Sequence, residues 1–111
     1  VPMLYKNQSF DGYSWASAMA VQNLAGTDAT VRVTYYPYNG GTSTTYLTSV
    51  GANSAVNIDQ RYDPNLSAGS FGGSAIVEST TGEPISVLVN VRGNSGPSSD
   101  FFASYVGVPI Q

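Results

Sequence analysis

The sequence predicts an all-β protein, a β-sandwich of seven or eight short antiparallel strands. Three observations support this prediction. Apolar and polar residues alternate with a period of two, turn signals rich in Gly, Pro, Asn and Ser return about every ten residues, and helical spacing is hard to find. Short strands separated by regular turns are typical of sandwiches, in which each strand contributes one face to the core.

Alternation is clearest in the N-terminal half. A short first strand is expected at residues 2–6, and longer strands at residues 15–24 and 29–38. The side chains expected to face the core from the two longer strands are those of Trp15, Met19, Val21, Val31, Val33 and Tyr35. Asn39-Gly40 follows, and this pair favours a tight hairpin because both residues tolerate positive φ.

The C-terminal half continues the pattern. Five further strands are expected, at residues 42–50, 54–58, 71–79, 85–92 and 101–108. The fourth of these is the best candidate for a central strand, since it points a row of β-branched residues inward: Ile85, Val87, Val89 and Val91. Residues 59–70 form the longest irregular stretch.

Composition indicates a secreted or cell-surface protein of a single domain. The chain has 111 residues, of which 10% are charged, and its net charge is −3. An average globular domain has about 25% charged residues, so solubility here depends on Ser, Thr, Asn, Gln, Gly and Tyr. Four basic residues are too few to build a nucleic-acid surface. No apolar run is long enough for insertion into a membrane.

The residue types needed for most catalytic and metal sites are missing from the sequence. The chain has no Cys and no His, which excludes disulfides, thiol chemistry and Ser-His-Asp or Cys-His catalysis. Asp59, Asp63 and Asn65 share the long loop with Arg61, but their spacing does not match an EF-hand, and ordinary turn chemistry explains them better than calcium. We therefore expect no enzyme, no cofactor and no metal.

Tyrosines and glycosylation sequences are the remaining candidate sites. Tyr36, Tyr38, Tyr46 and Tyr62 are possible contacts for a glycan or a protein, because flat aromatic rings stack on sugars and anchor interfaces. Cross-strand aromatic pairing is the structural alternative. Lys6, the only lysine, is expected to be a solvated residue guarding a sheet edge.

Two sequences match the N-glycosylation pattern. They begin at Asn7 and at Asn65. Both are possible modification sites only in a host that glycosylates its surface proteins.

Two stretches resemble Ig-like repeats of prokaryotic secreted and cell-surface proteins. Their matching segments are Val21-Gln22-Asn23, the alternating run 29–36, and the pair 73–79 and 84–90. Such repeats often open with Val-Pro and an apolar residue, as this chain does at Val1. The resemblance implies an Ig-like sandwich with Greek-key connections. It also implies a non-catalytic module, often in tandem, in stalks, adhesins or extracellular fibres.

The two ends of the sequence suggest a junction between units. Val1-Pro2 returns as Val108-Pro109, so we expect residues 1–107 to form the domain and 108–111 to begin a next unit. Eight alternating strands would bring the chain back to the end where it began, whereas seven would leave its ends apart. An added terminal strand could close an open sheet edge of a neighbour. The expected junction residues are Val1, Pro2, Met3, Leu4, Tyr5, Val106, Val108, Pro109 and Ile110.

These observations favour a structural unit of an extracellular filament, stalk or surface layer. Its expected partners are copies of itself or neighbouring repeats, joined head to tail, with strand addition as one form of the joint and surface glycans as an additional kind of partner. The alternative is a carbohydrate-binding module that uses exposed hairpin tyrosines.

Overall fold

The structure is a computed structural model. It describes the backbone of residues 4–6, 8–10, 13–38, 40–66, 71–94 and 100–106, and the side chains of Leu4, Lys6 and residues 15–38, 40–66 and 71–91.

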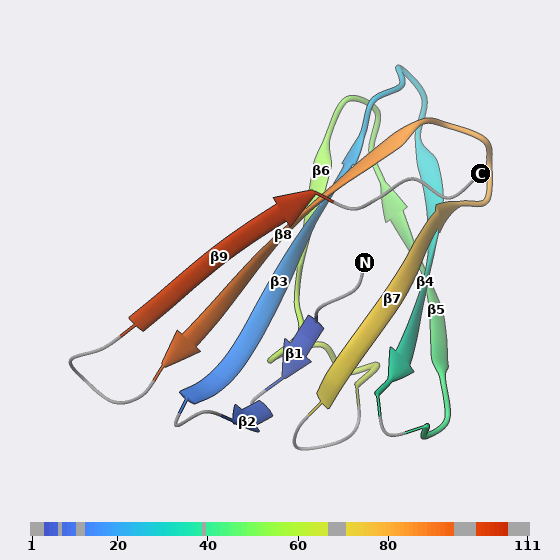
Figure 1. Ribbon diagram of the computed structural model, residues 1–111. Coiled ribbons are helices and arrows are strands. Elements are labelled where there is room, and N and C mark those ends of the chain that lie inside the picture. The colour runs from blue at the N-terminus through green and yellow to red at the C-terminus, as the bar shows by residue number, and fades with distance from the viewer. Residues whose placement is uncertain are drawn as a thin grey trace.

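The described residues form nine antiparallel strands in two packed sheets (Figure 1). The strands are β1 (Leu4–Lys6), β2 (Gln8–Phe10), β3 (Tyr13–Asn23), β4 (Ala29–Pro37), β5 (Thr44–Val50), β6 (Ala55–Asp59), β7 (Phe71–Ser79), β8 (Ile85–Asn94) and β9 (Asp100–Val106). One sheet has the order β1-β7-β4-β5. The other has the order β2-β3-β8-β9, and β6 also pairs with β3. The predicted β-sandwich is confirmed.

Six strands, three in each sheet, form the main body of the sandwich. They are β7-β4-β5 on one side and β6-β3-β8 on the other. The strand expected at residues 85–92 is central, since β8 lies between β3 and β9. The Thr-rich strand β5 lies at a sheet edge, where it pairs only with β4 among the described residues.

The described residues contain one more strand than the largest expected number, because the first pass through the sandwich is divided between the sheets. β1 pairs with β7 in the first sheet, and β2 pairs with β3 in the second. Both run antiparallel to their partners and in the same direction, so together they make one pass. The chain therefore makes eight alternating passes. We call the end with the β3–β4, β5–β6 and β7–β8 connections the upper end (Figure 1).

The core follows the predicted alternation closely. The inward residues of β3, β4 and β8 are buried between the sheets: Met19, Val21, Val31, Val33, Tyr35, Val87, Val89 and Val91. Trp15, Val56 and Ile58 are partly buried and pack against this cluster. Leu4 of β1 is also part of the core, with 0% exposure. The sandwich thus closes over apolar side chains supplied by both sheets and by the N-terminal strand.

The side chain of Asn23 holds the loops at the upper end together through hydrogen bonds. Its side-chain amide donates to the carbonyl oxygens of Thr27 (2.7 Å) and Val50 (3.1 Å), and its Oδ1 accepts from the Ala25 amide (3.0 Å). The residue is fully buried. A buried amide that satisfies several backbone groups of two loops explains why the strand ends in Asn.

Candidate functional site: a buried polar network and the loop it anchors

The most distinctive polar feature is a chain of hydrogen bonds between the two sheets, at the end opposite the upper end. It joins five side chains, which are those of Ser17, Tyr35, Tyr46, Gln60 and Asp63. The two tyrosines come from β4 and β5, and Ser17 comes from β3 in the other sheet. Gln60 and Asp63 come from the loop that follows β6. We call this set the inter-sheet network.

Asp63 is the acceptor at the centre of the network. Its Oδ2 accepts from the hydroxyl of Tyr35 at 2.7 Å and from that of Tyr46 at 2.9 Å. Its Oδ1 accepts from the backbone amide and the side-chain amide of Asn65, both at 2.9 Å. Asp63 is only 5% exposed. Four donors around a buried carboxylate are what an ionised acid needs when it is removed from water.

The pKa of Asp63 reflects two opposing effects. Burial raises the pKa, whereas the hydrogen bonds from Tyr35, Asn65 and Tyr46 lower it and together outweigh burial, so the net pKa lies below the ordinary value. Burial raises the pKa of Tyr35, and its hydrogen bond to Asp63 raises it further. Tyr35 therefore stays protonated and donates to an ionised Asp63 at neutral pH.

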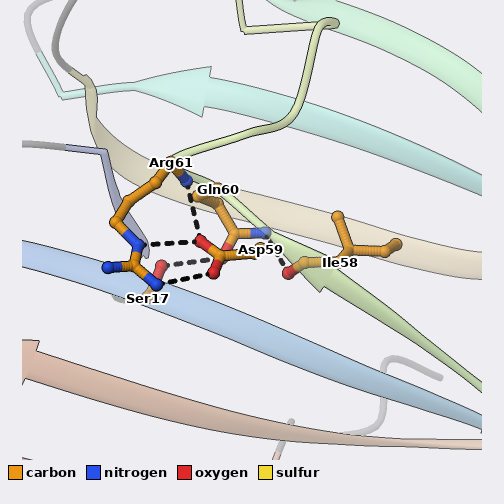
Figure 2. Close-up of polar contacts among 5 residues, drawn as sticks. All are labelled: Ser17, Ile58, Asp59, Gln60 and Arg61. Carbon is orange, nitrogen blue, oxygen red and sulfur yellow. Dashed lines mark hydrogen bonds and ion pairs between the residues drawn. The ribbon is translucent and has the colours of Figure 1, made fainter.

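Gln60 extends the network to the second sheet. Its Nε2 donates to the Tyr35 hydroxyl (3.1 Å) and to the Ile58 carbonyl (3.2 Å), and its Oε1 accepts from the Ser17 hydroxyl (2.8 Å). Its backbone amide also donates to the Ser17 carbonyl at 3.0 Å. Gln60 is fully buried. This one side chain therefore links β3 to β4 across the sandwich, and Figure 2 shows its hydrogen bond with Ser17 of β3.

Asp59, the last residue of β6, forms an ion pair with Arg61 at the start of the same loop. Arg61 donates from Nε to Asp59 Oδ1 at 3.2 Å and from Nη2 to Asp59 Oδ2 at 2.9 Å (Figure 2). The Arg61 guanidinium also lies 5.0 Å from the centroid of the Tyr62 ring. The hydrogen bonds from Arg61 lower the pKa of Asp59, against a smaller opposing effect of burial. The two side chains form a partly exposed ion pair beside an exposed ring.

The structure places the four candidate tyrosines in different environments. Tyr36 lies on β4 facing away from the core, Tyr38 lies just after β4, and both are exposed. Tyr62 is the most exposed of the four, at 75%. Tyr46 is half-buried and its hydroxyl is bound to Asp63. Tyr46 also packs against Tyr35 with 6.0 Å between ring centroids, so this pair fits the structural alternative of aromatic pairing.

The side chains of Asn65 and Lys6 both form hydrogen bonds with residues of the loop after β6. The Nδ2 atom of Asn65, to which a glycan would be attached, donates to Asp63. Asn7 lies outside the described residues. Lys6 lies on the edge strand β1, as expected, but it is half-buried and not fully solvated, and its Nζ donates to the Leu66 carbonyl at 2.6 Å. Lys6 therefore ties β1 to the end of the loop.

The expected junction residues fall into two groups. Leu4 and Tyr5 lie in β1 and pair with Gly73 and Gly72 of β7, and Val106 pairs with Leu88 of β8. The others lie outside the described residues; they are Val1, Pro2, Met3, Val108, Pro109 and Ile110. Within the described part of the chain, β1 thus belongs to its own sandwich.

Sequence reasoning missed Gln60 and Ser17, and it assigned Asp63 only to turn chemistry. The Asn65 amide bond to Oδ1 is indeed a turn contact. The sequence did contain a signal for the other contacts of the network, because the inward-facing Tyr35 needs a hydrogen-bond partner for its hydroxyl. The 59–70 loop is the long segment with polar side chains to supply one.

Among the described side chains, no three acidic residues gather as a metal site would require. No helix in this part of the chain is long and apolar enough to cross a bilayer. No protein-family model, curated protein or solved structure significantly matches the chain.

Proposed function

We propose that this protein is a structural, non-catalytic unit of an extracellular filament, stalk or surface layer. The observation that supports this most is the inter-sheet network. The described buried carboxylate, Asp63, has both oxygens occupied by donors of its own chain. Such an arrangement fixes the two sheets to each other and leaves no reactive geometry around the acid. The low charge and the polar uncharged surface are typical of proteins outside the cell.

The fold is further proposed to be Ig-like with Greek-key connections. The pairing of β6 with β3 and of β7 with β4 supports this, since the chain crosses between the sheets at each of these steps. The last two strands, β8 and β9, pair within one sheet, as the last two strands of an immunoglobulin domain do.

The partners are copies of the same unit or neighbouring repeats. β1 runs away from the upper end and β9 runs toward it, so the chain enters and leaves the described sandwich in opposite directions at one end. This topology does not favour a linear series in which the chain enters each unit at one end of the sandwich and leaves it at the opposite end. Units joined in series would instead meet through their upper ends or lie side by side.

Strand addition is the proposed form of contact. β1 pairs with β7 over three residues, and its Leu4 is completely buried in the core. A short strand with one deeply buried anchor is able to leave its own sandwich and occupy the same position in a copy, because the contacts in the two states are identical. Main-chain hydrogen bonds to β7 would then join the two chains.

The absence of Cys makes cross-linking a direct test. Tyr5 and Gly72 are register partners in β1 and β7. A chain with Tyr5→Cys is mixed with a chain with Gly72→Cys, and the mixture is concentrated and then oxidised. Exchange of β1 predicts a covalent dimer of one chain of each kind. The matched control mixes Thr34→Cys with Thr45→Cys, register partners of the β4–β5 hairpin, and predicts no covalent dimer.

Electron microscopy and sedimentation of the unmodified chain test assembly itself. Ordered polymers or discrete oligomers that grow with concentration support the proposal. A protein that stays monomeric at all concentrations, and whose parent protein contains no neighbouring unit of this kind, contradicts it. Oligomers without the Tyr5–Gly72 cross-link would keep the assembly and reject β1 as the exchanged strand.

A further inference from the structure

Three neighbouring side chains, those of Asp59, Arg61 and Tyr62, are not needed to hold the sheets together. We propose that they form a binding site for neutral carbohydrate, in which the Tyr62 ring stacks on the face of a pyranose. This inference goes beyond the structural role and does not depend on assembly. It places the sugar contact on the loop after β6 and not on the tyrosines of the β4–β5 hairpin.

The Tyr62 ring is exposed but held in place. It is 75% exposed, and the Arg61 guanidinium lies 5.0 Å from its centroid. The guanidinium is itself fixed by two hydrogen bonds to Asp59, of 3.2 and 2.9 Å. A ring whose orientation is already set loses little conformational freedom when a ligand stacks on it, and this loss is a main cost of binding.

The backbone beneath Tyr62 is equally well anchored. Its amide donates to the Asp59 carbonyl at 3.1 Å. On either side lie Gln60, which is fully buried, and Asp63, which is 5% exposed, both members of the inter-sheet network. The loop therefore presents Tyr62 from a rigid base, as binding loops on a stable scaffold do.

The polar groups beside the ring suit hydroxyls of a neutral ligand. The side chains of Arg61 and Asp59 are 36% and 31% exposed, and a guanidinium has five N–H donors, more than the ion pair uses. Their opposite charges compensate each other, which disfavours a strongly charged polymer. Asn57 is exposed and lies two residues before Asp59 on the same face of β6, where its amide adds donors and an acceptor.

The hairpin tyrosines lie elsewhere. Tyr36 is on the outward face of β4, in the sheet that does not contain β6. A ligand held at Tyr62 would follow the polar edge formed by β6. The two sites can therefore be told apart by substitution, even though both would use tyrosine.

Affinity electrophoresis with soluble polysaccharides tests the site. The folded full chain is run through gels that contain laminarin, xylan, mannan, galactan or soluble chitosan with a high degree of acetylation, and retardation by at least one is expected. Tyr62→Ala should weaken the affinity about tenfold, and Tyr62→Phe should stay within about twofold, because the stacking ring remains. Leu47→Ala is the matched control. Leu47 is 61% exposed on β5 in the other sheet, and its removal should leave the affinity unchanged.

Three results would overturn the inference. They are no retardation by any of the five polysaccharides, full affinity in Tyr62→Ala, and loss of affinity in Tyr36→Ala with Tyr62→Ala unaffected. The thermal midpoint of Tyr62→Ala should equal that of the parent protein, since the side chain is exposed. Assembly is measured without sugar, so a protein that polymerises but binds no polysaccharide rejects this inference alone.

Discussion

The hydroxyl of Tyr35 does two things at once. It donates to Asp63 Oδ2 at 2.7 Å and accepts from Gln60 Nε2 at 3.1 Å. Tyr35 is 1% exposed, so water cannot replace either contact. Buried polar groups stabilise a fold when every member is satisfied and destabilise it when one partner is lost. The effect of the network on stability therefore depends on single atoms.

Tyr35→Phe tests this dependence. The change keeps the ring but leaves Gln60 Nε2 with only one of its two acceptors, the Ile58 carbonyl, and leaves Asp63 with one donor fewer. We expect the free energy of unfolding to fall by about 1–3 kcal/mol, measured by urea denaturation. Tyr46→Phe is the matched control, because Tyr46 is half-buried and does not contact Gln60. It should cost less, and an equal or larger cost for Tyr46→Phe would contradict the central role of Tyr35.

Acid pH should weaken the network through Asp63. The folded-state pKa of Asp63 lies below its ordinary value. Its stabilisation is therefore fully present above the unfolded pKa of about 3.9 and is lost as pH falls through the folded pKa. Asp63→Asn should be less stable than the parent at neutral pH.

Comparing the pH dependence of stability in the parent and in Asp63→Asn isolates the contribution of Asp63. Denaturation midpoints between about pH 5 and pH 2 should fall less in Asp63→Asn than in the parent. Asp59 also has a lowered pKa, but it is present in both proteins and cancels in the difference. Parallel pH profiles would show that Asp63 does not carry the effect.

At the scale of the elements, β7 packs closely against β4 at Gly73. A Cβ added to Gly73 would overlap the Tyr36 carbonyl oxygen of β4 and would come within 2.6 Å of Phe71 Cζ. The first contact is with backbone, so one strand would have to move. This gives a physical reason for the glycine that begins the segment 73–79.

Gly73→Ala should therefore destabilise the protein although alanine suits strands better than glycine does. We expect a loss of about 1–3 kcal/mol in denaturation experiments, typical of overpacking. Gly26→Ala is the control, because a Cβ at Gly26 would meet nothing within 4 Å. Equal stability of the two variants would mean that β7 and β4 separate without cost.

The difference between what the sequence predicts and what it misses follows from distance along the chain. The inward faces of β3, β4 and β8 could be predicted because alternation is a local property, visible within a few residues. The division of the first pass into β1 and β2 could not, since β1 pairs with β7, which is remote in sequence, whereas β2 pairs with the neighbouring β3. The network was missed for the same reason. Tyr35 and Asp63 are 28 residues apart, and Ser17 and Gln60 are 43 apart.

At the scale of the whole molecule, the two sheets share one core and one polar network. Met19, Val21 and Val89 of one sheet are buried with Val31 and Val33 of the other in a single cluster. The chain crosses between the sheets at each of the three upper-end connections. Neither sheet can keep its apolar face covered once the other is lost, so separate melting of the sheets would expose the whole core.

We therefore expect unfolding to be a single cooperative transition, as in most small domains. Trp15, the only tryptophan, lies on β3 in one sheet and packs against the core. Tyr35 and Tyr46 lie in the other sheet in fixed orientations, where they contribute to the near-ultraviolet circular dichroism. Tryptophan fluorescence and this dichroism should give the same midpoint in urea. A fluorescence midpoint clearly below the dichroism midpoint would show that the β3 sheet melts first. In that case the network would not couple the two sheets.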